Sequence, residues 1–186
     1  MNRPALPKDK FQVGDLMYKA LEDGSGVAVA KYIDENITEV VIPDTITFGH
    51  YNYEVKEIGF GAFLGCSGLS SVTIGNSVTS IGEEAFWECS ALTSVTLGKN
   101  LTSIGDGAFL HCESLTSITI PDSVTSIGIC AFAGCKSLEF ITIPNSVTRI
   151  GDFAFCDCSG LTSVTVPSHT TIGEDAFPKH TQIIRK

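Results

Sequence analysis

The sequence predicts a repeat solenoid, a fold in which similar short coils stack into one elongated body. Three markers recur together through most of the 186 residues: a cysteine, an Ile-Gly pair and an Ala-Phe pair. The interval is 23 residues, as the cysteines show: Cys66, Cys89, Cys112, Cys135 and Cys158. Because three independent markers keep one register, we expect each interval to be one coil of a right-handed solenoid.

The order of residues within one unit, 69–91, predicts two short strands. Val72–Ile74 alternates apolar and polar residues, as a strand with one buried face does. Gly75 then favours a turn, and a second short extended stretch follows at 78–81. In a stack of coils the first strands of neighbouring units run parallel, and we expect them at Val95–Leu97, Ile118–Ile120, Ile141–Ile143 and Val164–Val166.

The rest of the unit predicts a single helical or 3₁₀ turn. Glu83–Phe86 has the length of one such turn and would place Phe86 in the core. Cys89 then closes the coil. Stacking would align Phe86 with its equivalents, so the core should contain one phenylalanine column: Phe86, Phe109, Phe132 and Phe155.

The two ends depart from the repeat and divide the chain into two predicted parts. Residues 1–36 form an N-terminal segment in which 15–21 and 27–30 flank a glycine-containing turn, as in a β-hairpin. We expect this hairpin to cap the first coil. Residues 37–186 form the solenoid of about six coils. Its first coil carries nine extra residues, which predict a second hairpin with a type II′ turn at Gly49-His50.

Composition excludes several classes of partner. Twelve Lys and Arg against 21 Asp and Glu leave a net charge of −9, whereas nucleic acids and anionic lipids bind basic patches. No apolar run approaches the roughly 18 residues of a membrane helix. The segment Met1–Pro7 lacks the apolar stretch of a signal peptide. We therefore expect neither nucleic-acid binding nor membrane insertion of this segment.

Residues 92–114, LTSVTLGKNLTSIGDGAFLHCES, resemble the BspA-type leucine-rich repeat of bacterial surface proteins. Residues 115–137 resemble it as well, and the similarity extends over about 37–184. The resemblance implies a leucine-rich repeat fold, exposure at the cell surface or secretion, and a role in adhesion or host interaction. It implies a protein ligand, such as a host extracellular protein, and no enzymatic activity. The alternatives are an intracellular interaction scaffold and, less favoured, a hydrolase.

The cysteines favour a structural role over a metal site or a nucleophile. Five of the seven occupy one repeat position, where a free cysteine behaves as a small apolar residue. No CxxC pair is present, and the Cys156-x-Cys158 spacing is not that of a zinc site. His111-Cys112 is adjacent, but Cys112 belongs to the repeat. We therefore expect no metal, cofactor or catalytic residue. Cys130 lies outside the repeat position, as Cys156 does, so a disulfide or reactive thiol should involve these two first.

Departures from the repeat on exposed positions are the candidate binding residues. Phe140 stands where other coils have serine, so it would project from the concave strand face beside Glu139 and Thr142. Arg149 replaces serine in the same coil. Because it belongs to the second extended stretch, the alternative is that it faces another side of the solenoid. The alternative for Phe140 is packing against a neighbouring side chain.

Three further aromatic residues are weaker candidates. Trp87 lies on the side of the predicted helical turn, where covering the convex edge of the solenoid is the favoured explanation. Tyr51 and Tyr53 lie in the nine-residue insertion. Both would serve equally well as packing residues against the N-terminal cap.

Overall fold

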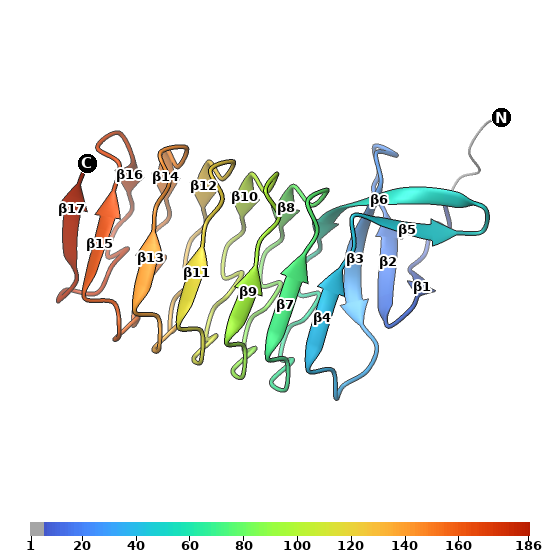
Figure 1. Cartoon of the computed structure of the whole chain (residues 1–186), viewed down its shortest axis with the longest axis horizontal. Coiled ribbons are helices and arrows are strands. Elements are labelled where there is room, and N and C mark those ends of the chain that lie inside the picture. The colour runs from blue at the N-terminus through green and yellow to red at the C-terminus, as the bar shows by residue number, and fades with distance from the viewer. Residues whose placement is uncertain (1–5) are drawn as a thin grey trace.

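The chain winds into a β-solenoid of about six turns in a computed structural model that describes residues 6–186 (Figure 1). The first five residues of the predicted N-terminal segment lie outside the described residues. Each regular coil contributes one strand to a front row, one to a back row and a turn to the third side. All three sides surround one continuous hydrophobic core.

The front row contains the strands predicted from the apolar alternation, and they pair in parallel. It divides into two sheets, because no ladder joins β9 to β11. The first sheet contains β4 (Glu39–Ile42), β7 (Ser71–Ile74) and β9 (Ser94–Thr96). The second contains β11 (Ser117–Thr119), β13 (Phe140–Thr142), β15 (Ser163–Val166) and β17 (Gln182–Arg185). We call the outward side of these strands the front face.

The back row forms one long sheet with the N-terminal strands. Its solenoid members are β6 (Tyr51–Ile58), β8 (Ser80–Ile81), β10 (Ser103–Ile104), β12 (Ser126–Ile127), β14 (Arg149–Ile150) and β16 (Thr171–Ile172). An antiparallel set precedes them: β1 (Phe11–Val13), β2 (Leu16–Ala20) and β3 (Val27–Tyr32). Strand β3 pairs in parallel with β6, so the sheet is continuous from the N-terminal strands into the repeats.

The nine-residue insertion forms the predicted second hairpin. Strand β5 (Thr45–Phe48) pairs antiparallel with β6, and Phe48 faces Tyr51 across a two-residue turn. Gly49 has a φ of 63°, whereas His50 does not have a positive φ. This is the combination that a type II′ turn requires.

The predicted phenylalanine column is present and is longer than expected. Neighbouring rings lie 5.0–5.2 Å apart and within 7° of parallel. Tyr32 extends the column at its N-terminal end, 6.0 Å from Phe63. The members are Phe63, Phe86, Phe109, Phe132, Phe155 and Phe177. Each ring covers its neighbour, so no single coil completes its own core.

The helical turn predicted at 83–86 does not form, and no helix occurs among residues 6–186. Glu84 and Glu88 adopt the left-handed conformation, with φ of 56° and 60°. Left-handed residues four positions apart cannot continue a right-handed helix. The N–H groups of Glu84, Phe86 and Glu88 donate instead to carbonyls of the next coil, at 2.8–2.9 Å. The third side of the solenoid is thus hydrogen-bonded between coils, as the strands are.

The glycine of each Ile-Gly pair allows neighbouring coils to approach closely. A Cβ atom built on Gly105 would lie 2.8 Å from the carbonyl oxygen of Ile81 and 2.8 Å from the carbonyl carbon of Gly82. Both atoms belong to the backbone of the preceding coil, so they cannot move aside as a flexible side chain would. Any larger residue at this position would push two coils apart.

We expect Gly105→Ala to lower the free energy of unfolding by about 1–3 kcal/mol, because the added methyl group overlaps the preceding coil. Gly68→Ala is the matched control. Its added Cβ would find only one atom within 4 Å, the Ile37 carbonyl oxygen at 3.8 Å, and Ala91 stands at the equivalent position of the next coil. Urea unfolding followed by circular dichroism measures both variants. Equal stabilities for the two variants would contradict the close-approach explanation.

Candidate functional site

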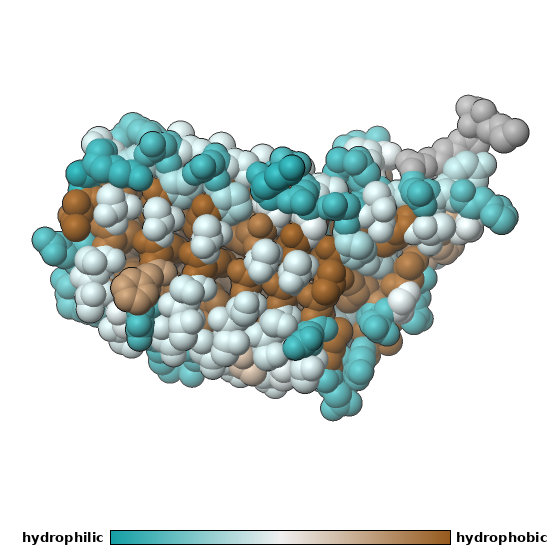
Figure 2. All heavy atoms as spheres, in the orientation of Figure 1, coloured by the Kyte–Doolittle hydropathy of each residue, from teal (hydrophilic) through white to brown (hydrophobic). Residues whose placement is uncertain are grey.

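The front face is a regular array of hydroxyl groups. Successive strands align their outward residues in register: Ser71 pairs with Ser94, and Thr73 with Thr96. Further along, Thr119 pairs with Thr142. The face is therefore largely uncharged. Figure 2 shows the pale polar residues of this face lying over a brown layer of hydrophobic residues.

Phe140 interrupts the serine row of this array. It lies at the start of β13 and pairs in register with Ser117. Its side chain is 72% exposed, whereas the next residue, Ile141, is buried in the core. Glu139 and Thr142 are exposed on either side of it along the chain. The structure thus places Phe140 outward, and the alternative of close packing against a neighbouring side chain does not apply.

Arg149 lies in a different sheet from Phe140. It belongs to β14 in the back row, where it pairs in register with Ser126 and Thr171. Its side chain is exposed. The structure therefore does not bring Phe140 and Arg149 together on one sheet, although they belong to the same coil. The two residues differ in position because the two strands of a coil face different sides of the solenoid.

The remaining predicted candidates are less exposed. Tyr53 is only 4% exposed and belongs to the hydrophobic core, so it is a packing residue and not part of the accessible surface. Tyr51 is half-buried and packs against the same core. Trp87 is half-buried on the third side, and its indole Nε1 is buried without a hydrogen-bond partner. Tyr53 faces inward because strand alternation places it on the buried side of β6.

After Phe140, the two most exposed of the large apolar residues were not predicted from the sequence. Val41 is 70% exposed on the front face, where it pairs with Thr73. Phe60 is 65% exposed on the third side, at the position where the next coils carry Glu83 and Asp106. The signal for both was the one that identified Phe140, namely an apolar residue at a polar repeat position.

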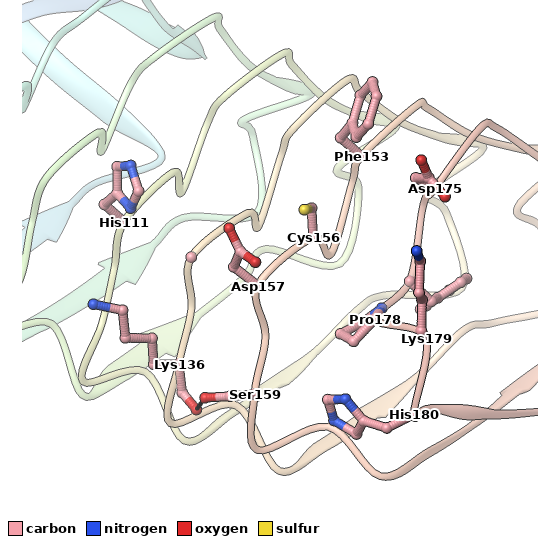
Figure 3. Close-up of a pocket in the computed structure, with 12 residues that line it drawn as sticks. His111, Lys136, Phe153, Cys156, Asp157, Ser159, Asp175, Pro178, Lys179 and His180 are labelled. Atoms are coloured by element: carbon pink, nitrogen blue, oxygen red, sulfur yellow. Dashed lines mark hydrogen bonds between the residues drawn. The ribbon is translucent and has the colours of Figure 1, made fainter.

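A pocket of about 610 Å³ lies on the third side near the C-terminal end (Figure 3). It forms where the last coil is shortened: Ser163 pairs with Gln182, 19 residues later rather than 23. Its lining includes His111, Cys156, Asp157, Phe153 and Pro178. Figure 3 shows His111 and His180 on opposite sides of the pocket, so the two imidazoles do not converge on the Cys156 thiol.

The repeated cysteines are buried and hydrogen-bonded to the coil that precedes them. The Sγ–H groups of Cys89, Cys112, Cys135 and Cys158 donate to phenylalanine carbonyls at 3.1–3.2 Å. Burial raises the pKa of the Cys112 thiol to about 12, and burial also raises that of Cys89. Neutral thiols of this kind are poor nucleophiles. The place of Cys112 in the buried cysteine column explains why this residue is present, and the adjacent His111 is exposed to solvent.

The described residues contain neither a group of side chains suited to a metal ion nor a helix suited to crossing a membrane. Among residues 6–186, no three His, Cys, Asp or Glu side chains are grouped as a metal ion would require. Within the same range, no helix is long and apolar enough to cross a membrane.

Comparison with known proteins identifies similar chains. The pattern of the BspA type leucine rich repeat region matches residues 56–184 in six copies. A leucine-rich repeat protein of T. pallidum is 30% identical, with a TM-score of 0.78 over 94% of this chain and 86% of its own. A leucine rich cell surface protein of Faecalibacterium prausnitzii is 31% identical, with a TM-score of 0.69 over 96% of this chain and 53% of its own.

The pneumococcal vaccine antigen PcpA is 25% identical, with a TM-score of 0.76 over 94% of this chain and 48% of its own. The chain thus spans about half the length of the Faecalibacterium and pneumococcal proteins. No curated protein sequence matches it.

We expect a thiol reagent such as Ellman's reagent to modify only Cys130 and Cys156 of the seven cysteines in the native protein at neutral pH. These two are partly exposed, and the other five are buried. After unfolding in urea, all seven thiols should react. Cys130→Ser should lower the native count by one. Rapid reaction of more than two thiols would contradict the buried state of the cysteine column.

Stability should decrease in alkaline solution. The Cys112 thiol has a pKa of about 12 in the fold against 9.0 ordinarily, and burial raises the pKa of Tyr18 to about 12 from 10.0. Above pH 9 the unfolded chain therefore releases protons that the folded chain retains. The free energy of unfolding should fall from about pH 9 towards pH 12.

Urea unfolding at a series of pH values measures this decline. Cys112→Ala removes one of the groups whose pKa is raised, so the decline should be shallower in that variant. A stability that stays constant through this range would contradict the prediction.

Proposed function

The chain belongs to the BspA-type leucine-rich repeat family, and on that premise we propose that it is a non-enzymatic protein-binding module of a bacterial cell-surface or secreted protein, acting in adhesion or host interaction. The location is supported by relatives described as a cell surface protein and a vaccine antigen. The proposed binding surface is the front face around Phe140. Residues 37–186 form the module, and strands β1–β3 within residues 1–36 cap its first coil.

The observation that carries the proposal is the exposure of Phe140. Serine at the paired position, Ser117, is sufficient for the same strand to fold, so folding gives no reason for an aromatic ring that is 72% exposed. Exposed aromatic residues are enriched at the centres of protein interfaces. The strands beside Phe140 present hydroxyl groups, and Glu139 is the charged residue next to it along the chain, so a protein partner can cover most of this face without burying unpaired charges.

An intracellular scaffold would use the same binding surface. The compartment in which the native protein is found distinguishes a surface protein from such a scaffold. Detection of the intact protein on unpermeabilised bacteria by an antibody against the chain would support the surface location. Exclusive detection after permeabilisation would favour the scaffold. A hydrolase would require converging catalytic groups, and the pocket near Cys156 does not bring its histidines to the thiol.

We expect Phe140→Ser to weaken binding to the partner by about 2 kcal/mol, or roughly 30-fold in Kd, because the variant removes the anchoring ring. Partners are first captured from host extracellular proteins on the immobilised chain and identified by mass spectrometry. Affinities are then measured by surface plasmon resonance with the purified partner. The melting temperature should hardly change, since the ring is exposed.

Phe60→Ser is the matched control, because it removes a phenylalanine of similar exposure, 65%, from a different side of the solenoid. It should leave affinity unchanged. A Phe140→Ser variant that binds as tightly as the unmodified chain would remove the front face as the proposed site. A large loss of melting temperature in that variant would show that Phe140 is a packing residue.

A further inference from the structure

The third side of the solenoid lacks one inter-coil hydrogen bond at the pocket near the C-terminal end. In four successive coils, the N–H at one position of the turn donates to a carbonyl of the next coil at 2.7–2.9 Å. The donors are Gly65, Glu88, His111 and Gly134. Asp157 stands at the equivalent position of the penultimate coil, but its N–H donates to no group of residues 6–186. Because Asp157 lines the pocket, this N–H is a free donor beside the cavity.

The shortened last coil explains why the acceptor is missing. Gln182 follows Phe177 by five positions, whereas its strand partner Ser163 follows Phe155 by eight. The last coil thus lacks three residues in the part of the turn that would face Asp157. The same shortening opens the pocket of about 610 Å³, so the free N–H and the cavity have one cause.

The pocket has an apolar wall. Phe153 and Cys156 line it from the penultimate coil, and Pro178 lines it from the last one (Figure 3). Phe153 is 39% exposed, and its equivalents are Glu84 and Gly107, so the fold does not require an aromatic ring at this position. A ligand with apolar side chains can cover this wall and remove it from water.

The pocket also carries charges of both signs. Asp157 and Asp175 are acidic and Lys179 is basic, and none of the three belongs to either ion pair found within residues 6–186. Figure 3 shows Asp157 on one coil and Asp175 with Lys179 on the next. Both carboxylates lie close to the Cys156 thiol, whose pKa is raised by burial and then by these two charges. A ligand that pairs with all these groups has to carry a cation and an anion.

We propose that this pocket binds a zwitterionic peptide of about two residues with apolar side chains. The amide carbonyl of the peptide accepts a hydrogen bond from the N–H of Asp157 and so replaces the missing acceptor. The α-ammonium group pairs with the carboxylates of Asp157 and Asp175, and the α-carboxylate pairs with Lys179. The apolar side chains lie against Phe153 and Pro178. The site is on the third side, so it is independent of the front face.

The dimensions of the pocket suit such a ligand. Small-molecule sites in proteins measure roughly 300–1,000 Å³, and this pocket lies within that range. An extended dipeptide spans about 7 Å, somewhat more than the 5.0 Å between the stacked rings of Phe155 and Phe177. Its two charged ends can therefore reach groups on both coils. A free amino acid has both charges but no amide carbonyl for the N–H of Asp157.

The test is isothermal titration calorimetry of the full chain with the dipeptide Leu-Phe, for which we expect saturable binding. Acetylated Leu-Phe lacks the ammonium group, and Leu-Phe amide lacks the carboxylate. Each should bind roughly ten-fold more weakly, because it loses a charge-assisted hydrogen bond. Gly-Gly keeps both charges and the carbonyl but has no apolar side chain, so it should bind at least about ten-fold more weakly.

Nuclear magnetic resonance provides a second readout at the free donor. Saturation with Leu-Phe should move the amide proton of Asp157 downfield, because that proton gains an acceptor. The amide proton of Glu88, which already donates to the carbonyl of Leu110 at 2.9 Å, should hardly move. An Asp157 amide that does not shift at saturation would overturn the proposed carbonyl contact.

Variants of the chain test the apolar wall. Phe153→Gly should weaken Leu-Phe binding roughly ten-fold, and it should still fold, because Phe153 has a φ of 57° and Gly107 stands at the equivalent position. Circular dichroism checks the fold. Phe140→Ser is the control, since it removes an exposed ring from the front face, and it should leave Leu-Phe affinity unchanged. Equal affinities for Leu-Phe and Gly-Gly, or no saturable binding of Leu-Phe, would overturn the proposal.

Discussion

The whole structure depends on a single axial spacing that three sides of the solenoid have to share. The phenylalanine rings stack at 5.0–5.2 Å, and the inter-coil hydrogen bonds from Glu84, Phe86 and Glu88 measure 2.8–2.9 Å. Both distances hold only when the backbones of neighbouring coils are in near contact, which Gly105 and its equivalents permit. Ring contact, backbone pairing and the close spacing at glycine thus follow from one constraint. A change that separates the coils at any of these three contacts also weakens the other two.

The same constraint explains the unusual backbone of the turns. A right-handed helical turn satisfies its N–H groups within the coil, and this would leave the neighbouring coil's carbonyls unpaired. Left-handed residues at two positions of each turn before the last direct these N–H groups along the stack instead. Non-glycine residues, among them Cys130, Phe153 and Asp157, adopt this conformation at φ of 53–58°. The cost is about 1–2 kcal/mol for each residue, and the inter-coil hydrogen bonds and ring contacts offset it.

Periodicity made the strands, the phenylalanine column and the buried cysteines predictable, because each of these features repeats and each repeat confirms the others. The hairpin at Gly49-His50 was predictable from turn chemistry alone. The helical turn was predicted wrongly, since Glu83–Phe86 has a helix-like composition and the left-handed conformation of Glu84 depends on a partner in the next coil. The register of the repeat correctly placed Phe140 on the outside. The separation of Phe140 from Arg149 depends on how the coil bends between its two strands, and the spacing of residues along the chain does not specify that bend.

The interrupted front row has a mechanical consequence. Ladder hydrogen bonds run without a break along the back row from β6 to β16, but they are missing on the front between β9 and β11. Bending that separates the front edges of the coils therefore meets least resistance at this level, while the continuous back sheet resists extension. The back sheet, the hydrogen bonds of the third side and the phenylalanine column all continue through this level, so only the front row loses a set of restraints there. Phe140 and Val41 lie on opposite sides of this break, so the spacing between these two exposed apolar residues depends on the level at which the front row is least restrained.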